Sequence, residues 1–369
     1  EEIRKTYNSL AEEYDVIVME GAGSPAEINL RDNDLVNMGM AKMADAPAIL
    51  VGDIDRGGVF ASLAGTMLLF DEDERARVKG VVINKFRGDL EILKPGLSML
   101  EDIIKVPVLG VVPYMNVDID DEDSLSEKFT KKDRAALIDI AVIRLPRISN
   151  FTDFNVLEYM EGVGVRYVKK TGDLGDPDLV IIPGTKNTMG DLLWMRQCGM
   201  EANVLKYASG GKPIIGVCGG YQILGKKISD PGGVEHGGEL DAMGLLPHST
   251  IFADEKVTKE VTGKLSSVTG IFSELSGKEY TGYEIHMGSQ EKDANIINRG
   301  NVYGTYIHGV FDREGIASTL VKALLKEKGL DPSAIEAFNL EEYKQRQYDI
   351  LADGMRKALN MDMLLDIIR

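Results

Sequence analysis

Residues 211–225, GKPIIGVCGGYQILG, decide how the second half of the chain is interpreted. The apolar run PIIGV is typical of a buried parallel strand, and YQIL after it has the apolar spacing of a helix. Cys218 stands between them at a tight turn that two glycines permit. Such an elbow exposes its central side chain at a helix N-terminus, where the helix dipole favours a thiolate. We therefore interpret Cys218 as a candidate nucleophile, the alternative being an inert core cysteine.

A nucleophilic cysteine needs a base, and the chain contains 4 histidines. His308 ends the strand-like run VYGTYIH and precedes a glycine, a position from which a side chain can reach an elbow. We expect His308 to take the proton of Cys218 in the hydrolysis of an amide. The other three histidines lie in loop-like sequence or inside an alternating strand, where a structural role is commoner: His236, His248 and His286.

A Pro-Gly turn follows the predicted strand at 179–182 and reads PGTKNT over residues 183–188. Exposed backbone amides beside the end of a sheet can stabilise a developing oxyanion. We expect the N–H groups of Gly184, in this turn, and of Gly219, after the cysteine, to serve as the oxyanion donors. A plain strand–helix turn is the alternative interpretation of residues 183–188 taken alone.

The composition is that of a soluble globular protein, and its charge bears on the kind of partner it can have. The 369 residues carry a net charge of −17, and no basic patch is visible, so we expect neither nucleic acid nor an anionic membrane as a partner. The two cysteines, Cys198 and Cys218, cannot form a disulfide framework and indicate a reducing compartment. No apolar run reaches membrane-spanning length and no signal peptide is visible, so a cytoplasmic location is expected.

Strands alternate with helices in the first half, which predicts an α/β fold with a doubly wound parallel sheet. The predicted strands are 15–20, 48–53, 78–83 and 106–113. Ligands bind at the carboxyl ends of such strands, where carboxylates suit Mg²⁺ and arginine suits a phosphate or carboxylate. A surface ion pair between Asp53 and Arg56 is the alternative. The candidate residues at these strand ends are Glu20, Asp53, Asp55, Arg56, Asn84 and Lys85.

Composition and pattern divide the chain into four segments. Residues 1–115 form the first α/β domain, and the highly charged stretch 116–137 is interpreted as a linker. Residues 138–312 form a second α/β domain, and residues 313–369 are interpreted as an amphipathic helical tail.

Eight long motifs, in unbroken order from about residue 15 to about residue 312, resemble those of the cobyric acid synthase family. This family consists of glutamine-dependent amidotransferases of cobalamin biosynthesis. The motifs are VMEGAGSPAEINLRDND, VGDIDRGGVFASL, INKFRGD, LPRISNFTDF, IPGTKNTMGDLLWMR, GVCGGYQILG, GYEIHMG and GTYIHGVFD.

The resemblance implies two active sites. The first domain is similar to the P-loop fold of dethiobiotin synthetase, which uses ATP and Mg²⁺ to convert a carboxylate into an acyl phosphate. The second is similar to a class I glutaminase, in which Cys218 matches the nucleophile and His308 the base. The implied substrates are glutamine and a corrinoid, adenosylcobyrinic acid a,c-diamide, amidated on its b, d, e and g carboxylates. Glu20, Asp53 and Asp55 match the acidic motifs of the synthetase site, and Asn84 and Lys85 its nucleotide-side motif.

Two departures from the family pattern bear on these expectations. No GxxxxGK[ST] motif occurs in the chain, so we expect the P-loop to lie upstream of a first domain that is incomplete as given. Many class I glutaminases carry a glutamate two residues after the histidine, where this chain has Val310. The third member of the triad is therefore open: Glu284, another carboxylate or a backbone carbonyl.

Three other functions remain compatible with the sequence. The related cobyrinic acid a,c-diamide synthases share the fold and the mechanism. A glutaminase subunit could serve another amide ligase, and a non-catalytic binding module could keep the elbow without its chemistry. A homo-oligomeric state is left open.

Overall fold

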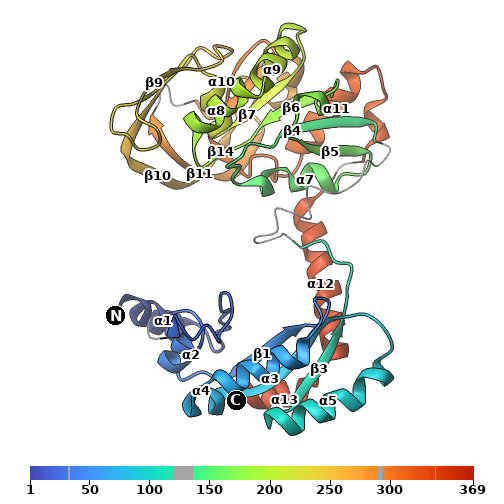
Figure 1. The fold of residues 1–369 in the computed structure, drawn as a ribbon. Helices are drawn as coiled ribbons and strands as arrows, with labels where there is room; N and C mark the ends of the chain where they lie inside the picture. Colours follow the sequence, from blue (N-terminus) through green and yellow to red (C-terminus); the bar gives the residue numbers. More distant parts are fainter. Residues whose placement is uncertain (32–33, 120–135, 290–293, 337) are drawn as a thin grey trace. The chain divides into compact units, whose positions relative to one another are not determined.

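The computed structural model describes residues 1–31, 34–119, 136–289, 294–336 and 338–369. The chain folds into two compact units (Figure 1). Unit 1 comprises Glu1–Ile119 together with Lys344–Arg369, and unit 2 comprises Asp120–Tyr343. The predicted linker at 116–137 falls largely outside the described residues.

Unit 1 is built on a three-stranded parallel sheet in the order β1-β2-β3. Its strands are β1 (Ala48–Asp53), β2 (Val78–Phe86) and β3 (Val108–Pro113). Apolar side chains of α3 (Val59–Leu69) and α5 (Leu90–Ile104) pack on one face of this sheet. The unit also contains α1 (Glu2–Glu13), α2 (Met38–Ala44) and α4 (Glu72–Arg77).

The predicted strand at 15–20 is wrong. These residues have no regular secondary structure, and Val16 and Val18 are 53% and 89% exposed. An apolar run becomes a buried strand only when another strand pairs with its backbone. Within the described residues, no strand pairs with 15–20, so Glu20 does not stand at the end of a sheet strand.

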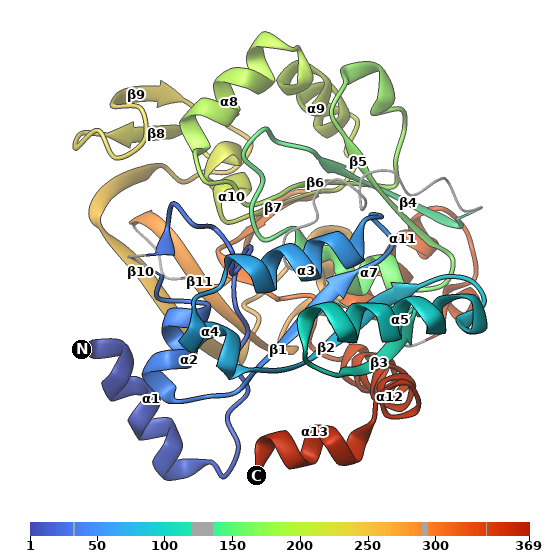
Figure 2. The same cartoon turned by 60° about the horizontal axis from the view of Figure 1, so that its bottom comes forward.

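The C-terminal segment packs on the other face of the same sheet. The helices α12 (Leu340–Ala358) and α13 (Met361–Ile368) supply apolar side chains that pack against Val82, Leu109 and Val112. Figure 2 shows α13 and α3 on opposite faces of the sheet. The backbone N–H of Asn360 donates to the carbonyl of Leu109 at 2.7 Å. The stretch 313–369 is thus divided between the two units instead of forming one tail.

Unit 2 contains a six-stranded sheet in the order β12-β13-β7-β6-β4-β5. All neighbouring pairs from β13 to β5 are parallel, and β12 is an antiparallel edge strand. The carboxyl ends of the parallel strands therefore meet at one edge. The strands are β4 (Ile138–Ile143), β5 (Val163–Val168), β6 (Leu179–Ile182), β7 (Ile214–Val217), β12 (Ile297–Arg299) and β13 (Val302–Thr305).

Both faces of this sheet are covered, which explains the near-continuous apolar strands. Along β4, Ile140 and Val142 face the cluster that contains α11 (Ile316–Glu327). Ala141 and Ile143 face the cluster that contains α8 (Thr188–Gln197) and α9 (Met200–Ser209). This doubly covered parallel sheet agrees with the predicted α/β fold of the second domain.

A second sheet of five strands, in the order β14-β11-β10-β8-β9, completes unit 2. The longest strand of this sheet, β10, pairs with β11 along most of its length. The register pairs Tyr283 of β11 with His308 of β14. The strands are β8 (Lys227–Asp230), β9 (Gly238–Asp241), β10 (Thr250–Lys264), β11 (Glu279–Ser289) and β14 (Ile307–His308).

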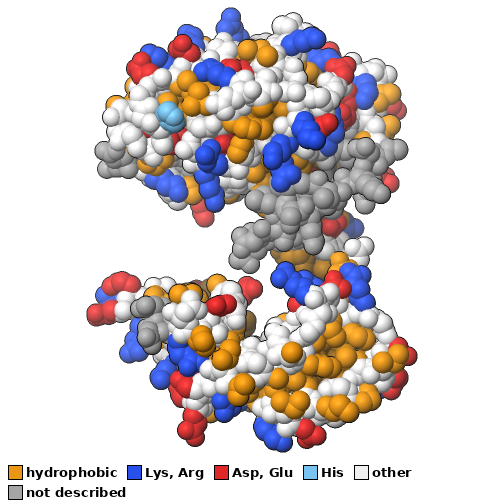
Figure 3. Space-filling view, in the orientation of Figure 1, with side chains coloured by type: hydrophobic (Ala, Val, Ile, Leu, Met, Phe, Trp, Pro, Cys, Tyr) orange, Lys and Arg blue, Asp and Glu red, His pale blue; other side chains and the backbone are white. Residues whose placement is uncertain are grey.

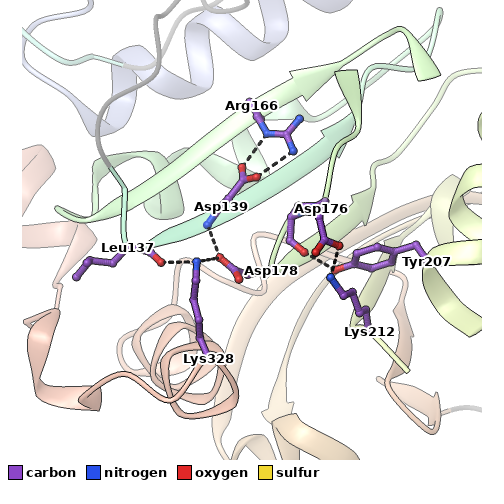
Figure 4. A network of polar contacts seen from close by, with 9 residues as sticks. Leu137, Asp139, Arg166, Asp176, Asp178, Tyr207, Lys212 and Lys328 are labelled. Atoms are coloured by element: carbon purple, nitrogen blue, oxygen red, sulfur yellow. Dashed lines mark hydrogen bonds and ion pairs between the residues drawn. The ribbon is translucent and has the colours of Figure 1, made fainter. Parts of the chain in front are cut away.

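A polar network lies where β4 and β6 begin, the opposite edge of the six-stranded sheet from the strand ends described below (Figure 4). Arg166 binds Asp139 with both prongs of its guanidinium group, at 2.8 and 2.9 Å. Asp178 accepts hydrogen bonds from the backbone N–H of Asp139 and from Lys328 after α11, each at 2.8 Å. The network thus fixes the end of α11 to the sheet and stands apart from the cysteine elbow.

Hydrophobic side chains gather on the surface of unit 1 that carries α3 and α5 (Figure 3). Leu68, Met99 and Ile103 are 78%, 65% and 68% exposed on these helices. Among the described residues, no helix is long and apolar enough to cross a membrane.

Candidate active site

Cys218 forms the predicted elbow between β7 and α10 (Gly219–Leu224). Its backbone has φ 51° and ψ −109°, a combination that L-residues rarely adopt and that marks stored strain at functional sites. The neighbouring glycines allow this path, because a Cβ added to Gly220 would lie 1.9 Å from the carbonyl oxygen of Ile182. The side chain is 7% exposed, and Sγ lies 3.5 Å from the carbonyl oxygen of Ile285.

His308 is buried next to a carboxylate that the sequence did not reveal. Its Nδ1 lies 2.7 Å from Oδ2 of Asp153, and the backbone N–H of Gly309 donates to Oδ1 of the same residue at 2.9 Å. His308 and Asp153 are 1% and 3% exposed. A carboxylate can only accept, so Nδ1 carries the proton and Nε2 is left for another group.

The surroundings of His308 favour its protonated form. Burial lowers the pKa of the imidazole, but the hydrogen bond to Asp153 and the contact with Cys218 outweigh burial and raise the pKa to about 10. The cysteine at the elbow and the histidine at the end of β14 are therefore in contact, as the sequence led us to expect. Together they form the arrangement in which a histidine activates a thiol.

Asp153 comes from the loop that follows β4. It lies in a 3₁₀ turn, Phe151–Phe154, which begins after Asn150 in the left-handed conformation with φ 52°. The only sequence signal for it is its place after the carboxyl end of a parallel strand, within the quoted motif LPRISNFTDF. No feature of the local sequence indicates that Asp153 contacts His308, which lies 155 residues further along the chain.

Glu284, the named candidate for the third triad member, has other partners. Its Oε2 lies 3.1 Å from Nζ of Lys259 and 3.5 Å from Nε2 of His286. In this structure the carboxylate on Nδ1 of His308 is that of Asp153 instead.

The two glycines expected to provide the oxyanion donors lie beside the cysteine and the histidine. A Cβ added to Gly184 would lie 3.1 Å from Cε1 of His308, and one added to Gly219 would lie 3.1 Å from the backbone nitrogen of Thr185. The turn after β6 and the start of α10 are therefore adjacent. The ends of β4, β6 and β7 lie at one edge of the six-stranded sheet, and the chain reaches His308 in β14 just after β13 ends at the same edge.

A buried polar side chain lies beside Cys218, and both its oxygen and its nitrogen have hydrogen-bond partners. Gln222, one turn after Cys218, is buried, and its Oε1 accepts from the hydroxyl of Thr188 at 3.1 Å. Its Nε2 donates to the carbonyl of Met287 at 2.9 Å and lies 3.2 Å from the hydroxyl of Tyr306. On the outer side, the ring of Tyr283 stacks on His308 with 5.2 Å between centroids.

The strand-end residues of unit 1 form a second polar cluster. Nζ of Lys85 lies 3.0 Å from Oδ2 of Asp53, and Nε of Arg56 lies 3.8 Å from the same oxygen. Arg87 binds Asp55 at 2.9 Å. Burial raises the pKa of Asp53, but its bonds to Lys85 and to a backbone amide leave the pKa lowered.

The other two predicted strand-end residues are Asn84 and Glu20, and only Asn84 is connected to this cluster, through Lys85. Asn84 lies near the carboxyl end of β2, and its Oδ1 accepts the backbone N–H of Lys85 at 2.9 Å. Lys85 itself has a left-handed backbone with φ 60°. Glu20 is exposed, and within the described residues no hydrogen bond or ion pair joins it to this cluster.

These carboxylates do not form a metal site in this arrangement. Asp53 and Asp55 are each bound by cationic side chains, which compete with a cation for the same oxygens. In the part of the chain that the structure describes, no group of three or more His, Cys, Asp or Glu side chains could hold a metal ion.

The geometry of unit 2 is that of a glutamine amidotransferase. Residues 139–316 match the model of the CobB/CobQ-like glutamine amidotransferase domain, and residues 1–120 match that of an AAA domain, a P-loop class.

The chain belongs to the cobyric acid synthase family. It is 58% identical to the cobyric acid synthase of Ruminiclostridium cellulolyticum, over 99% of this chain and 75% of that protein. It is 52% identical to the cobyric acid synthase of Lachnoclostridium phytofermentans, over 100% of this chain and 77% of that protein. The match to the cobyric acid synthase of Alkaliphilus metalliredigens is 49% identical over 99% of this chain and 78% of that protein.

Proposed function

We propose that this protein amidates the carboxylates of a corrinoid, with glutamine as the nitrogen source and ATP as the source of energy. The observation that carries the proposal is the meeting of a strained cysteine elbow with a buried histidine–carboxylate pair. Membership of the cobyric acid synthase family supports the choice of substrates. In this proposal the substrate is adenosylcobyrinic acid a,c-diamide, and amides form at its b, d, e and g carboxylates.

The glutaminase step begins when the sulfur of Cys218 attacks the side-chain amide carbon of glutamine and its proton passes to Nε2 of His308. The backbone N–H groups of Gly219 and of the Gly184 turn stabilise the oxyanion of the tetrahedral intermediate. His308 then gives the proton to the leaving nitrogen, the C–N bond breaks, and ammonia departs. Water, deprotonated by His308, cleaves the remaining thioester, so that glutamate leaves and the thiol is restored.

Asp153 acts as the third member of the triad in this proposal. Its carboxylate holds Nδ1–H of His308, which turns Nε2 toward the cysteine and stabilises the imidazolium that forms during each proton transfer. The burial of both residues supports this role, because a buried hydrogen-bonded pair keeps a single orientation.

The synthetase step converts a corrinoid carboxylate and ATP into an acyl phosphate and ADP. Ammonia then attacks the acyl carbon and displaces inorganic phosphate to give the amide. We assign Asp53, Asp55, Arg56, Asn84 and Lys85 to this site because they stand at the carboxyl ends of β1 and β2. Glu20 is assigned to the same site only through its family motif. Mg²⁺, when bound, would accompany the phosphates of ATP and offset part of their negative charge.

The test separates the two nitrogen sources in the full-length protein. With ATP, Mg²⁺ and adenosylcobyrinic acid a,c-diamide, mass spectrometry of the corrinoid counts the amides formed from glutamine or from ammonium. Cys218→Ala should abolish amidation from glutamine and retain amidation from ammonium. Cys198→Ala is the matched control, since the thiol of this other cysteine donates to the carbonyl of Met195 at the end of α8. Retention of glutamine-dependent amidation in Cys218→Ala, or loss of both reactions, would refute the assignment.

A further inference from the structure

A fully buried carboxylate joins two loops that carry groups of the glutaminase site. Asp191, in the first turn of α8, is 0% exposed. Its Oδ2 accepts the hydroxyl of Thr185 at 2.6 Å and the backbone N–H of Arg147 at 3.1 Å. Its Oδ1 pairs with Nη1 of Arg147 at 3.1 Å. Thr185 follows Gly184 in the turn after β6, and the loop after β4 continues from Arg147 to the 3₁₀ turn that contains Asp153.

The two loops also meet through backbone contacts outside the strands of the sheet. The backbone N–H of Ser149 donates to the carbonyl of Gly184 at 2.9 Å, and Ile148 forms an isolated antiparallel bridge with Thr185. Loops joined in this way lack the continuous ladder that fixes a strand. The bonds of Asp191 add to their rigidity, because a buried polar network with its partners in place holds one arrangement.

The capping of α8 does not explain the burial of this carboxylate. The side chain of Asn187 already caps the helix by accepting the backbone N–H of Gly190 at 2.6 Å. Removing a carboxylate from water is costly unless hydrogen-bond donors or a positive charge replace the water. The donors that replace it at Asp191 belong to the two loops, so its burial stabilises the position of one loop against the other.

The turn that Asp191 holds lies directly against the nucleophile and the base. The backbone nitrogen of Thr185 would lie 3.1 Å from a Cβ placed on Gly219. A Cβ placed on Gly184 would lie 3.1 Å from Cε1 of His308. An N–H group stabilises an oxyanion only at hydrogen-bond distance, so a displacement of about 1 Å in this turn can lower the rate by about 100-fold.

We infer that Asp191 is a positioning residue, which sets the oxyanion donor of the Gly184 turn against Cys218 through its bonds to Thr185 and Arg147. This inference rests on the proposed glutaminase function. It adds a buried carboxylate that touches neither the thiol nor the imidazole and acts through the backbone of the turn.

The test replaces the carboxylate with an amide of the same shape. In Asp191→Asn the amide turns an N–H group toward one of the three donors that reach the carboxylate, whichever way it is oriented, so the loops must shift. We expect kcat for glutamate release to fall by about 100-fold with KM changed by less than about threefold, because the oxyanion forms only after glutamine is bound. Steady-state assays of the full-length protein, with ATP and the corrinoid present, measure both constants.

Alkylation of Cys218 by iodoacetamide separates positioning from a general loss of structure. This reaction requires the thiolate but forms no oxyanion, so its rate in Asp191→Asn should stay within about threefold of the wild-type rate. Mass spectrometry of the peptide that contains Cys218 follows this reaction separately from the alkylation of Cys198. Amidation supported by ammonium should be unchanged.

Asp178→Asn is the matched control. This aspartate also accepts a backbone N–H and a cationic side chain, those of Asp139 and Lys328, but at the opposite edge of the sheet. Its kcat should stay within about twofold of the wild-type value. Thr185→Val removes only the hydroxyl bond to Asp191 and should lower kcat by about tenfold, whereas Thr185→Ser should keep it within about threefold. This pair tests the inference if Asp191→Asn folds poorly.

The outcomes distinguish this inference from the function on which it rests. A kcat of Asp191→Asn within threefold of the wild-type value, or a fall in the alkylation of Cys218 as large as the fall in kcat, would overturn the positioning role and leave the glutaminase intact. If the wild-type protein released no glutamate from glutamine, the proposed function itself would fall, and the inference with it.

Discussion

The imidazole of His308 lies between two partners that both favour its positive charge. Asp153 accepts a hydrogen bond from Nδ1–H, and Cys218 contacts the same buried imidazole, so the pKa of His308 is raised by both contacts. This arrangement favours proton transfer from the thiol to the histidine, because the imidazolium that forms is stabilised before substrate arrives.

The first prediction concerns the carboxylate of Asp153. Asp153→Asn presents an amide to Nδ1 and removes the negative charge, so the tautomer and the stabilisation of the imidazolium are both lost. We expect kcat for glutamine hydrolysis to fall by about 100- to 10,000-fold, with KM changed by less than about threefold. Steady-state assays of glutamate release measure both constants.

A surface aspartate provides the control for that substitution. Asp176→Asn removes only an exposed pair with Lys212 and should leave kcat within about twofold. Normal kcat in Asp153→Asn, together with a large loss in Glu284→Gln, would instead support Glu284 as the third triad member.

Part of this site could be predicted from the sequence, and there is a physical reason why the rest could not. Cys218 and His308 carry local signals, an elbow between glycines and a strand end before a glycine. Asp153 carries none that distinguishes it from other loop aspartates, because its role depends on segments after β4 and at the end of β14, strands of two different sheets that come together only in the folded unit. Glu284 is close to His308 across the β11–β14 pairing, yet its side chain binds Lys259 and His286.

At the scale of elements, the elbow depends on the close approach of β6 to the start of α10. A Cβ on Gly220 would lie 1.9 Å from the carbonyl oxygen of Ile182 and 2.9 Å from that of Pro183. Backbone atoms of a central strand cannot move aside without loss of the ladder that they form. The glycine after Gly219 is therefore a requirement of the packing, and it also sets the position of Cys218.

The second prediction follows from this contact. Gly220→Ala should lower the free energy of unfolding of unit 2 by about 3 kcal/mol, the upper range for overpacking in a core. It should also lower glutamine hydrolysis at least tenfold, because the elbow must shift. Chemical denaturation and the glutaminase assay are the two measurements.

Gly172→Ala serves as the comparison for Gly220→Ala. A Cβ at Gly172 meets nothing within 4 Å, and this glycine is not in the left-handed region. Its stability should change by less than about 0.5 kcal/mol. A Gly220→Ala protein with wild-type stability and activity would show that the elbow tolerates a side chain there and that the packing argument is wrong.

Element prediction succeeded where periodicity and pairing agreed. The strands at 48–53 and 179–182 formed as predicted, because each is paired within its sheet. The run at 15–20 has the same apolar composition, yet it has no strand partner among the described residues, and its valines remain exposed. An apolar sequence therefore does not determine a strand by itself, because the strand also requires a partner strand in the sheet.

At the scale of the whole molecule, the residues assigned to glutamine hydrolysis all lie in unit 2, and the strand-end cluster of Asp53 and Lys85 lies in unit 1. The chain crosses between the units twice, since Lys344–Arg369 returns to pack on the sheet of unit 1. The sequence predicted two α/β domains but not this return, because the amphipathic pattern of α12 does not specify which sheet will cover it.

The central claim is that Cys218 performs the hydrolysis of glutamine. The most direct test is the rate of glutamate release from glutamine by the wild-type protein and by Cys218→Ala under identical conditions. We predict steady release by the wild type and a loss of at least about 1000-fold in the variant, as expected for removal of a catalytic nucleophile. Release by Cys218→Ala within tenfold of the wild-type rate would contradict the account.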